Sequence, residues 1–203
     1  MRDASERDLG VHLETALRGV IIGERWPKSG CEVVITVLED EEDGWWHDGT
    51  TGERSGGWGM MSVLAGCITV ASAALVDAGI DCVDLVSGGV AAVVARSDKG
   101  REEMMIDPCP SEHDVRAACV VGYLQSRDEI TEMWLKGDAG AQTDALIDEA
   151  VKAARMTRTV LADAVKEAAE LKTGGKDEEA VNGVTKPKER KQKAVEREVV
   201  MTG

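Results

Sequence analysis

The chain has 203 residues, a length that suits one domain with a sizeable core plus a tail. Hydrophobic residues make up 43% of it, which is too large a share for an intrinsically disordered protein. The formal net charge of −14 repels phosphate backbones on average and so argues against an autonomous nucleic-acid-binding domain.

The first predicted element is a helix with Ser5 as its N-cap. It should end before Trp26, because the residue that precedes a proline avoids the α region. Its apolar stripe follows helical spacing and comprises Leu9, Leu13, Ala16, Leu17, Val20 and Ile21.

A continuous β-branched run at residues 32–38 predicts a strand that is buried on both faces. The acidic, Gly-rich residues 39–57 predict a long exposed loop, which contains Trp45 and Trp46. A second helix is predicted from Trp58 to Asp77, with Gly79 in the left-handed position after its end. The uncharged stretch at residues 55–76 is long enough to span a membrane. Its richness in small residues and its lack of flanking basic residues instead predict a buried helix.

Several strands should follow, at residues 80–86, 89–95, 102–106, 116–124 and 129–135, the last two as a hairpin. A turn is expected at residues 97–100 and a break at the Asp-Pro-Cys-Pro stretch that begins at residue 107. The order of helices and strands predicts an α+β layered architecture.

A long closing helix should be capped by Thr143 or Asp144 and run to about Leu171. After it the composition changes to Gly, Lys, Glu and isolated Val, with a basic cluster at residues 186–193. Such a segment buries too little apolar surface to offset the entropy of ordering, so residues 172–203 are predicted to be a disordered charged tail.

The five cysteines form no Cys-x-x-Cys pair and the three histidines are scattered, so the spacing predicts neither a metal site nor a cofactor. Several of the cysteines lie in apolar predicted strands or helices, where their thiols should be buried and reduced, which indicates a reducing compartment. The N-terminus is charged from the start and has no apolar core of a signal peptide.

Glycines at residues 56–59 open the second helix, where free backbone N–H groups could hold a phosphate. No strand directly precedes them and no Lys or Arg stands in the first turn, so a flexible helix entry is the preferred interpretation. Two groups of acids could support acid–base or metal chemistry, but we expect no partnering His or Arg beside them. These acids are Asp107, Glu112, Asp114, Asp81 and Asp84.

Three stretches, in chain order, resemble motifs of ribonuclease PH-like proteins. Residues 25–29 (R-W-P-K-S) resemble the family's R-Y-P-K-S, and residues 74–86 resemble its A-L-A-D-A-G-I…D-L-V passage. Residues 105–112 resemble its L-L-D-P-T…E segment. The resemblance covers about residues 5–171 and implies mixed sheets with packed helices. It also implies assembly in a six-membered ring around an RNA-threading pore, as in the RNA exosome.

Active family members degrade RNA from its 3′ end with inorganic phosphate, which they hold in a cradle of the Thr/Ser-Arg-Thr type. By this resemblance the cradle's arginine falls at Gly59 or Met60 and its serine at Ser62, which leaves a degenerate phosphate site without charge. The catalytic aspartates fall around Ser111 and residues 116–117, where no acid aligns unless the alignment shifts to Asp114. The resemblance thus implies no catalytic residue.

Residues 1–171 are therefore predicted to be the later part of a ribonuclease PH-like domain, without the family's strand-rich opening half. Without those strands the run at residues 32–38 would lack cover, and we expect the chain alone to be poorly stable.

The predicted function is a non-catalytic structural subunit of the exosome ring, located in nucleus, nucleolus and cytoplasm. Its predicted partners are the other ribonuclease PH-like ring subunits and a cap subunit, with RNA bound through the complex and no membrane. Arg25 and Lys28 are candidate RNA or subunit contacts, with a solvated basic turn as the alternative. Two other functions remain open: an active phosphorolytic 3′ exoribonuclease, and an acidic α+β interaction module unrelated to RNA.

Overall fold

The computed structural model of the chain describes residues 4–38, 58–95, 102–110 and 112–183. The predicted loop at residues 39–57 and the predicted turn at residues 97–100 lie outside these ranges. The chain divides into two compact units, residues 1–165 and residues 166–203. The packing described below concerns the first unit. The second unit contains the helical residues 166–183.

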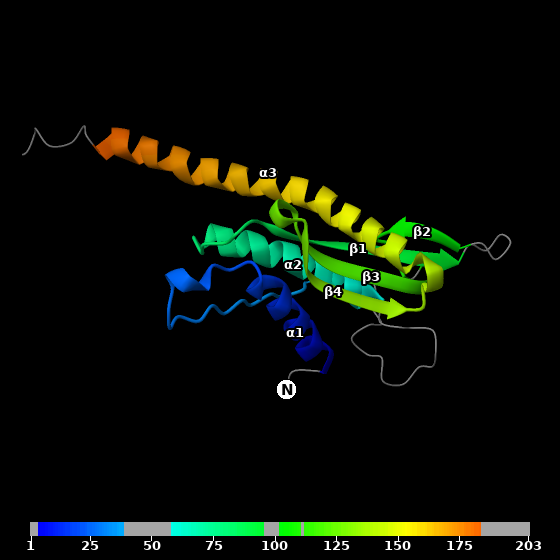
Figure 1. Ribbon diagram of the computed structural model, residues 1–203. Helices are drawn as coiled ribbons and strands as arrows, with labels where there is room; N and C mark the ends of the chain where they lie inside the picture. The colour runs from blue at the N-terminus through cyan, green and yellow to red at the C-terminus, as the bar shows by residue number, and fades with distance from the viewer. Residues whose placement is uncertain (1–3, 39–57, 96–101, 111, 184–203) are drawn as a thin grey trace, which may run out of the picture. The chain divides into compact units, whose positions relative to one another are not determined.

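The first unit is built around a four-stranded antiparallel sheet with strand order β2-β1-β3-β4 (Figure 1). Short 3₁₀ turns lie at residues 23–25, 125–127 and 140–142. In chain order the main elements are α1 (Ala4–Arg18), α2 (Gly59–Asp77), β1 (Val86–Ala95), β2 (Glu102–Ile106), β3 (Asp114–Leu124), β4 (Glu129–Gly137) and α3 (Thr143–Gly183).

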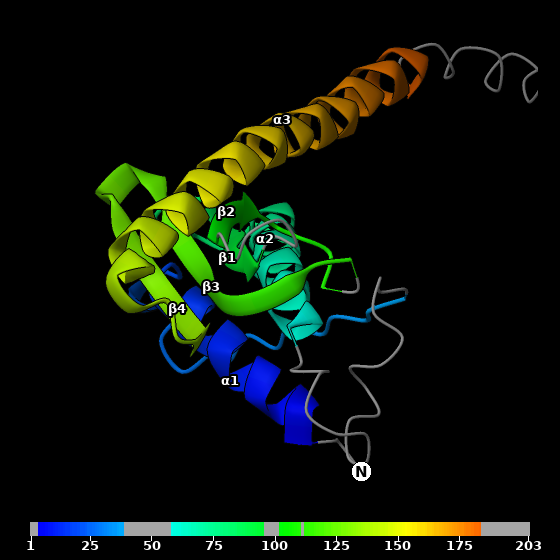
Figure 2. The same cartoon turned by 90° about the vertical axis from the view of Figure 1, so that its right-hand side faces the viewer.

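Helices cover both faces of the sheet (Figures 1 and 2). On one face α1 and α2 pack against the sheet, in a core that contains fully buried Met61, Leu64 and Ile68. On the other face α3 contributes Leu146 and Ala150 to a second core. The alternation of side chains along β1 and β3 supplies both cores, because successive residues of a strand point to opposite faces. The α+β prediction is confirmed.

Two adjacent glycines of β1 let both helical layers approach the sheet closely. A Cβ at Gly88 would lie 2.1 Å from the carbonyl oxygen of Ala65 in α2. A Cβ at Gly89 would lie 2.3 Å from the carbonyl oxygen of Ala150 in α3. Because the two residues face opposite sides, the absence of a side chain at each position sets the spacing of all three layers.

Among the described residues, the first half of β1 has a β-strand neighbour on one side only. β2 pairs with residues 91–95 of β1, whereas β3 pairs along the whole of β1. On the side that β2 leaves open, hydroxyl groups of α2 accept the backbone hydrogen bonds: Val86 N–H donates to Ser72 Oγ at 3.0 Å and Gly88 N–H to Thr69 Oγ1 at 3.0 Å. The helix thereby satisfies an otherwise open sheet edge.

The first helix is shorter than predicted, because a tertiary contact takes over its last apolar residues. α1 ends at Arg18, and Ile21 forms an isolated antiparallel bridge with Cys82. Val83 N–H donates to the carbonyl of Val20 at 2.9 Å in the same contact. The strand predicted at residues 80–86 is correspondingly wrong: this bridge replaces it, and the strand proper begins at Val86.

The strand predicted at residues 32–38 is also wrong, because no backbone partner strand is present for it in the described part of the chain. The segment nevertheless keeps a strand's alternation. Val33 and Ile35 are half-buried against the core, while Val34 and Leu38 are 79% and 93% exposed. A β-branched run favours extended backbone, but a strand also needs a neighbour to receive its hydrogen bonds.

The predicted second helix is confirmed as α2, with Trp58 in the capping position. Gly79 has φ +74°; its N–H donates to the carbonyl of Val76 and the N–H of Ile80 to that of Leu75, which is a Schellman ending. By length and composition this helix is apolar enough to cross a membrane. Here its buried residues belong to the core that α1, α2 and one face of the sheet share.

The later part of the prediction holds well: β2, β3 and β4 lie where strands were expected. α3 begins at Thr143, but the Thr143 hydroxyl donates to the carbonyl of Gly140 at 2.9 Å instead of accepting a helix N–H. The helix continues past the predicted limit at Leu171 to Gly183, so residues 172–183 are helical and not a disordered tail. Residues 184–203 lie outside the described ranges.

Candidate functional site

The predicted phosphate site lies at the start of α2. Gly59 is its buried first residue and Met60 follows, half-buried. Ser62 lies one turn into the helix, and its Oγ donates a hydrogen bond of 2.6 Å to Oδ1 of Asp107. Asp107 follows β2 directly and has φ +44°, a left-handed conformation that Asp tolerates better than most residues. The tertiary structure thus brings a carboxylate to this helix turn.

A cavity of about 380 Å³ opens beside this contact, bordered by α2, the open half of β1, the end of β2 and α3. None of the described residues that line it is basic. Two of its polar groups are already engaged: Thr69 Oγ1 donates to the carbonyl of Ala65 and Thr157 Oγ1 to that of Ala153. Asp107 is the one ionisable residue among the described lining residues, so the cavity carries negative charge.

Of the acids singled out in the sequence, Asp107 lines this cavity, whereas Asp114 opens β3 and accepts from Arg116 Nη2 at 2.9 Å. Glu112 lies in a turn in which its N–H donates to the carbonyl of Cys109 at 3.1 Å. The expectation that these acids have no arginine partner is wrong for Asp114. No group of three or more potential metal ligands occurs within the described residues.

Asp84, on the connection into β1, is also paired with an arginine, contrary to prediction. Its Oδ1 accepts from Arg158 Nη2 of α3 at 2.8 Å and from Leu85 N–H at 2.8 Å, and its Oδ2 from Ser126 N–H at 3.1 Å. Burial alone would raise the pKa of Asp84, but the hydrogen bonds and the charge of Arg158 outweigh it and lower the pKa. This pair ties α3 to the start of β1 across 74 residues of sequence.

A second polar cluster joins β3, the β3–β4 turn and α3. The hydroxyl of Tyr123 donates to Asp128, and Arg155 Nη2 donates to the same hydroxyl at 2.7 Å and to Asp128 Oδ1 at 3.1 Å. The Tyr123 hydrogen bond and then the charge of Arg155 lower the pKa of Asp128. Tyr123 is the chain's only tyrosine, but nothing local in the sequence marks its two partners.

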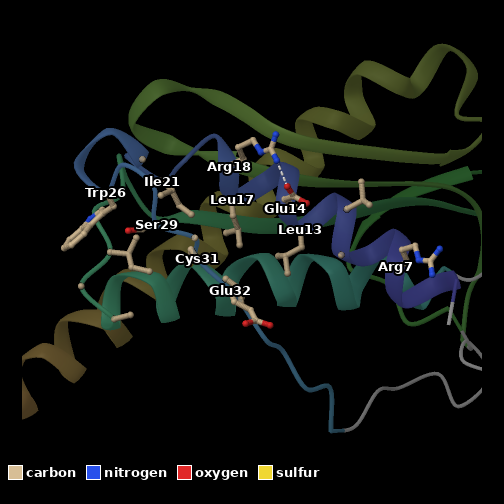
Figure 3. Close-up of a pocket in the computed structure, with 18 residues that line it drawn as sticks. Arg7, Leu13, Glu14, Leu17, Arg18, Ile21, Trp26, Ser29, Cys31 and Glu32 are labelled. Atoms are coloured by element: carbon tan, nitrogen blue, oxygen red, sulfur yellow. Dashed lines mark hydrogen bonds and ion pairs between the residues drawn. The ribbon is translucent and has the colours of Figure 1, made fainter. Parts of the chain in front are cut away.

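The two predicted RNA contacts lie in the turn after α1. Arg25 Nη1 pairs with Oδ2 of Asp81 at 3.1 Å, so a neighbouring carboxylate balances its charge. Lys28 is exposed and has φ +69°. Next to this turn, a wide cavity of about 1260 Å³ runs between α1 and the extended residues that follow, with Trp26 at one end and Arg7 at the other (Figure 3).

None of the five cysteines, all of which lie in the described residues, forms a disulfide, and Cys119 is the one that is buried. Burial raises the pKa of Cys119 to about 11, which makes its thiol unreactive at neutral pH. Cys31 is exposed in the extended segment after the first turn. The prediction of buried thiols is confirmed for Cys119, whereas Cys67, Cys82 and Cys109 are half-buried.

Comparison with known proteins agrees with this architecture. Residues 1–81 match the model of the 3′ exoribonuclease family, domain 1. The chain is 49% identical over 172 residues to exosome complex component MTR3 of Chaetomium thermophilum, which covers 82% of this chain and 59% of that protein. It is 29% identical over 165 residues to exosome complex component mtr3 of Schizosaccharomyces pombe, covering 79% and 56% of the two chains.

A third similar protein is exosome complex component RRP41-like of Arabidopsis thaliana, 33% identical over 127 residues, 62% of this chain and 40% of that protein. The chain thus spans between half and two thirds of the length of the two MTR3 relatives. Together with the antiparallel sheet and its packed helices, these matches support a ribonuclease PH-like α+β fold, in which residues 1–81 are similar to domain 1 of the 3′ exoribonuclease family.

Proposed function

We propose that this protein is a non-catalytic structural subunit of an RNA exosome ring, which supports 3′-to-5′ RNA degradation that another subunit carries out. The similarity to two exosome components of the MTR3 type supports the assignment to the complex. The chemistry at the start of α2 supports the absence of catalysis.

Phosphorolysis needs inorganic phosphate held in line with the scissile bond, and the charge that develops in the transition state must be stabilised. At the start of α2 the described lining residues offer no guanidinium or ammonium group, and Ser62 is hydrogen-bonded to the carboxylate of Asp107. A carboxylate in this position repels phosphate. Its negative charge therefore offsets the attraction that the positive end of the helix dipole would exert on a phosphate at the start of α2. This one contact, Ser62 to Asp107, carries the proposal that the site is inactive.

As a ring subunit, the protein would contact other ribonuclease PH-like subunits and a cap subunit, and would meet RNA through the assembled complex. Within that complex Lys28, and Arg25 despite its pairing with Asp81, are the candidate RNA contacts. We further propose that it is located in the nucleus, nucleolus and cytoplasm.

The test combines assembly with activity. The purified chain, alone and co-expressed with the other ring subunits of the same organism, is given a 3′-tailed oligoribonucleotide with and without inorganic phosphate. We expect the chain to co-elute with a ring of several subunits of similar size, and to release no nucleoside diphosphate on its own. A phosphorolytic ribonuclease PH assayed in parallel is the positive control. Phosphate-dependent shortening by the chain alone would refute the inactive site, whereas failure to join any ring would refute the structural assignment.

A further inference from the structure

The cavity beside Ser62 and Asp107 combines a negative mouth with an apolar rim. Asp107 Oδ1 accepts the Ser62 hydrogen bond, and the carboxylate is exposed to solvent. On the rim, Val70 of α2 and Met156 of α3 are 58% and 60% exposed. Val160, 71% exposed, lies one helical turn after Met156 and therefore on the same side of α3.

This pairing of charge and apolar surface matches a long basic side chain. Such a side chain lays its methylene stem along apolar surface and keeps its charged end at a polar group. An anion is disfavoured, because the described lining residues carry one negative and no positive charge. A small inorganic cation would leave the rim of Val70 and Met156 without a role, and Val160 extends the apolar surface beyond what a small molecule in the cavity needs.

We propose that this cavity is a docking site for a lysine side chain of a protein partner, with Asp107 binding its ammonium group and Val70 and Met156 flanking its stem. Lysine fits better than arginine, since Asp107 Oδ1 already accepts from Ser62 and leaves Oδ2 for a single-point contact. The site lies outside the turn that holds Arg25 and Lys28, and it does not depend on membership of a ring.

The probe is an N-acetylated, C-amidated Gly-Lys-Gly tripeptide, added to the full-length chain while the methyl NMR signals of Val70 and Met156 are followed. The matched probe replaces lysine with norleucine, which keeps the stem and removes the charge. We expect the lysine peptide to shift both signals with an affinity about fivefold higher than the norleucine peptide, and this advantage to disappear at high salt.

Two variants locate the charge. Asp107→Asn should abolish the preference for lysine, and Asn tolerates the left-handed backbone at this position. Asp8→Asn, which removes an exposed acid of α1 outside the cavity, should leave the preference unchanged. Ser62→Ala frees Oδ1 and should keep or strengthen lysine binding.

The proposal is overturned if neither peptide shifts the Val70 and Met156 signals, or if both peptides bind equally well. It is likewise overturned if Asp107→Asn retains the full preference for lysine. Because the salt comparison uses the unmodified protein, it decides between these outcomes even if a variant fails to fold.

Discussion

Replacing Gly88 with alanine should force α2 away from the sheet. The new Cβ would lie 2.1 Å from the carbonyl oxygen and 2.4 Å from the Cα of Ala65, both backbone atoms that no rotamer change can move aside. Relief requires a helix displacement of roughly 1 Å, which loosens the contacts of buried Met61, Leu64 and Ile68. Overpacking lowers the free energy of unfolding by about 1–3 kcal/mol in typical cores. Because the new Cβ clashes with backbone atoms, we expect Gly88→Ala to lower it by about 3 kcal/mol or more.

Urea unfolding followed by far-UV circular dichroism measures this loss, which should correspond to a fall in Tm of roughly 6–12 °C for a chain of this length. Gly89→Ala should behave alike, because its Cβ would lie 2.3 Å from backbone atoms of α3. The matched control is Gly66→Ala within α2, where a Cβ meets nothing within 4 Å. There the better helix propensity of alanine should stabilise the protein by about 0.5–1 kcal/mol. A Gly88→Ala variant as stable as the wild type would refute the close packing of α2 on β1.

Two further predictions concern the Asp84–Arg158 ion pair and the reactivity of the cysteines. Asp84→Asn should destabilise the protein by about 1–3 kcal/mol at neutral pH, because it leaves the guanidinium of Arg158, whose side chain is 26% exposed, without its counter-charge. Since the fold lowers the pKa of Asp84, its contribution is complete above the unfolded value of about 3.9 and is lost as the pH falls through the lower folded value. Urea unfolding from neutral pH to pH 3 should therefore show an acid-side loss that is smaller in the variant, and identical profiles would contradict the pairing. In native protein at pH 8, iodoacetamide should modify exposed Cys31 and spare Cys119, whose pKa burial raises to about 11. Peptide mass spectrometry reads this out, and rapid labelling of Cys119 would argue against the second core.

Only one of the two features of the candidate site could be predicted from the sequence. The missing positive charge at the start of α2 can be read from Gly59, Met60 and Ser62, because it concerns residues within one helical turn. The carboxylate that faces Ser62 could not be read, since Asp107 stands 45 residues later and reaches the helix only because β2 ends beside it. No sequence pattern specifies a contact that depends on strand order.

The partners of the ion pairs could not be predicted from the sequence either. Asp84 was recognised as a candidate, but its partner Arg158 lies 74 residues away on α3. Asp81 and Arg25 are 56 residues apart. Such pairs form only when separate elements pack, so the sequence supplied the charges and the packing chose which of them meet.

By itself the sequence determined the elements whose stability is local. α2 with its glycine ending, the β3–β4 hairpin and the start of α3 follow from periodicity and turn residues a few positions apart. Only the tertiary structure decided that residues 32–38 do not form a strand and that α1 ends at Arg18. A β-branched run becomes a strand only beside another strand, and an apolar stripe remains helical only while no distant segment pairs with its backbone. Both decisions depend on neighbours in space, which local composition does not encode.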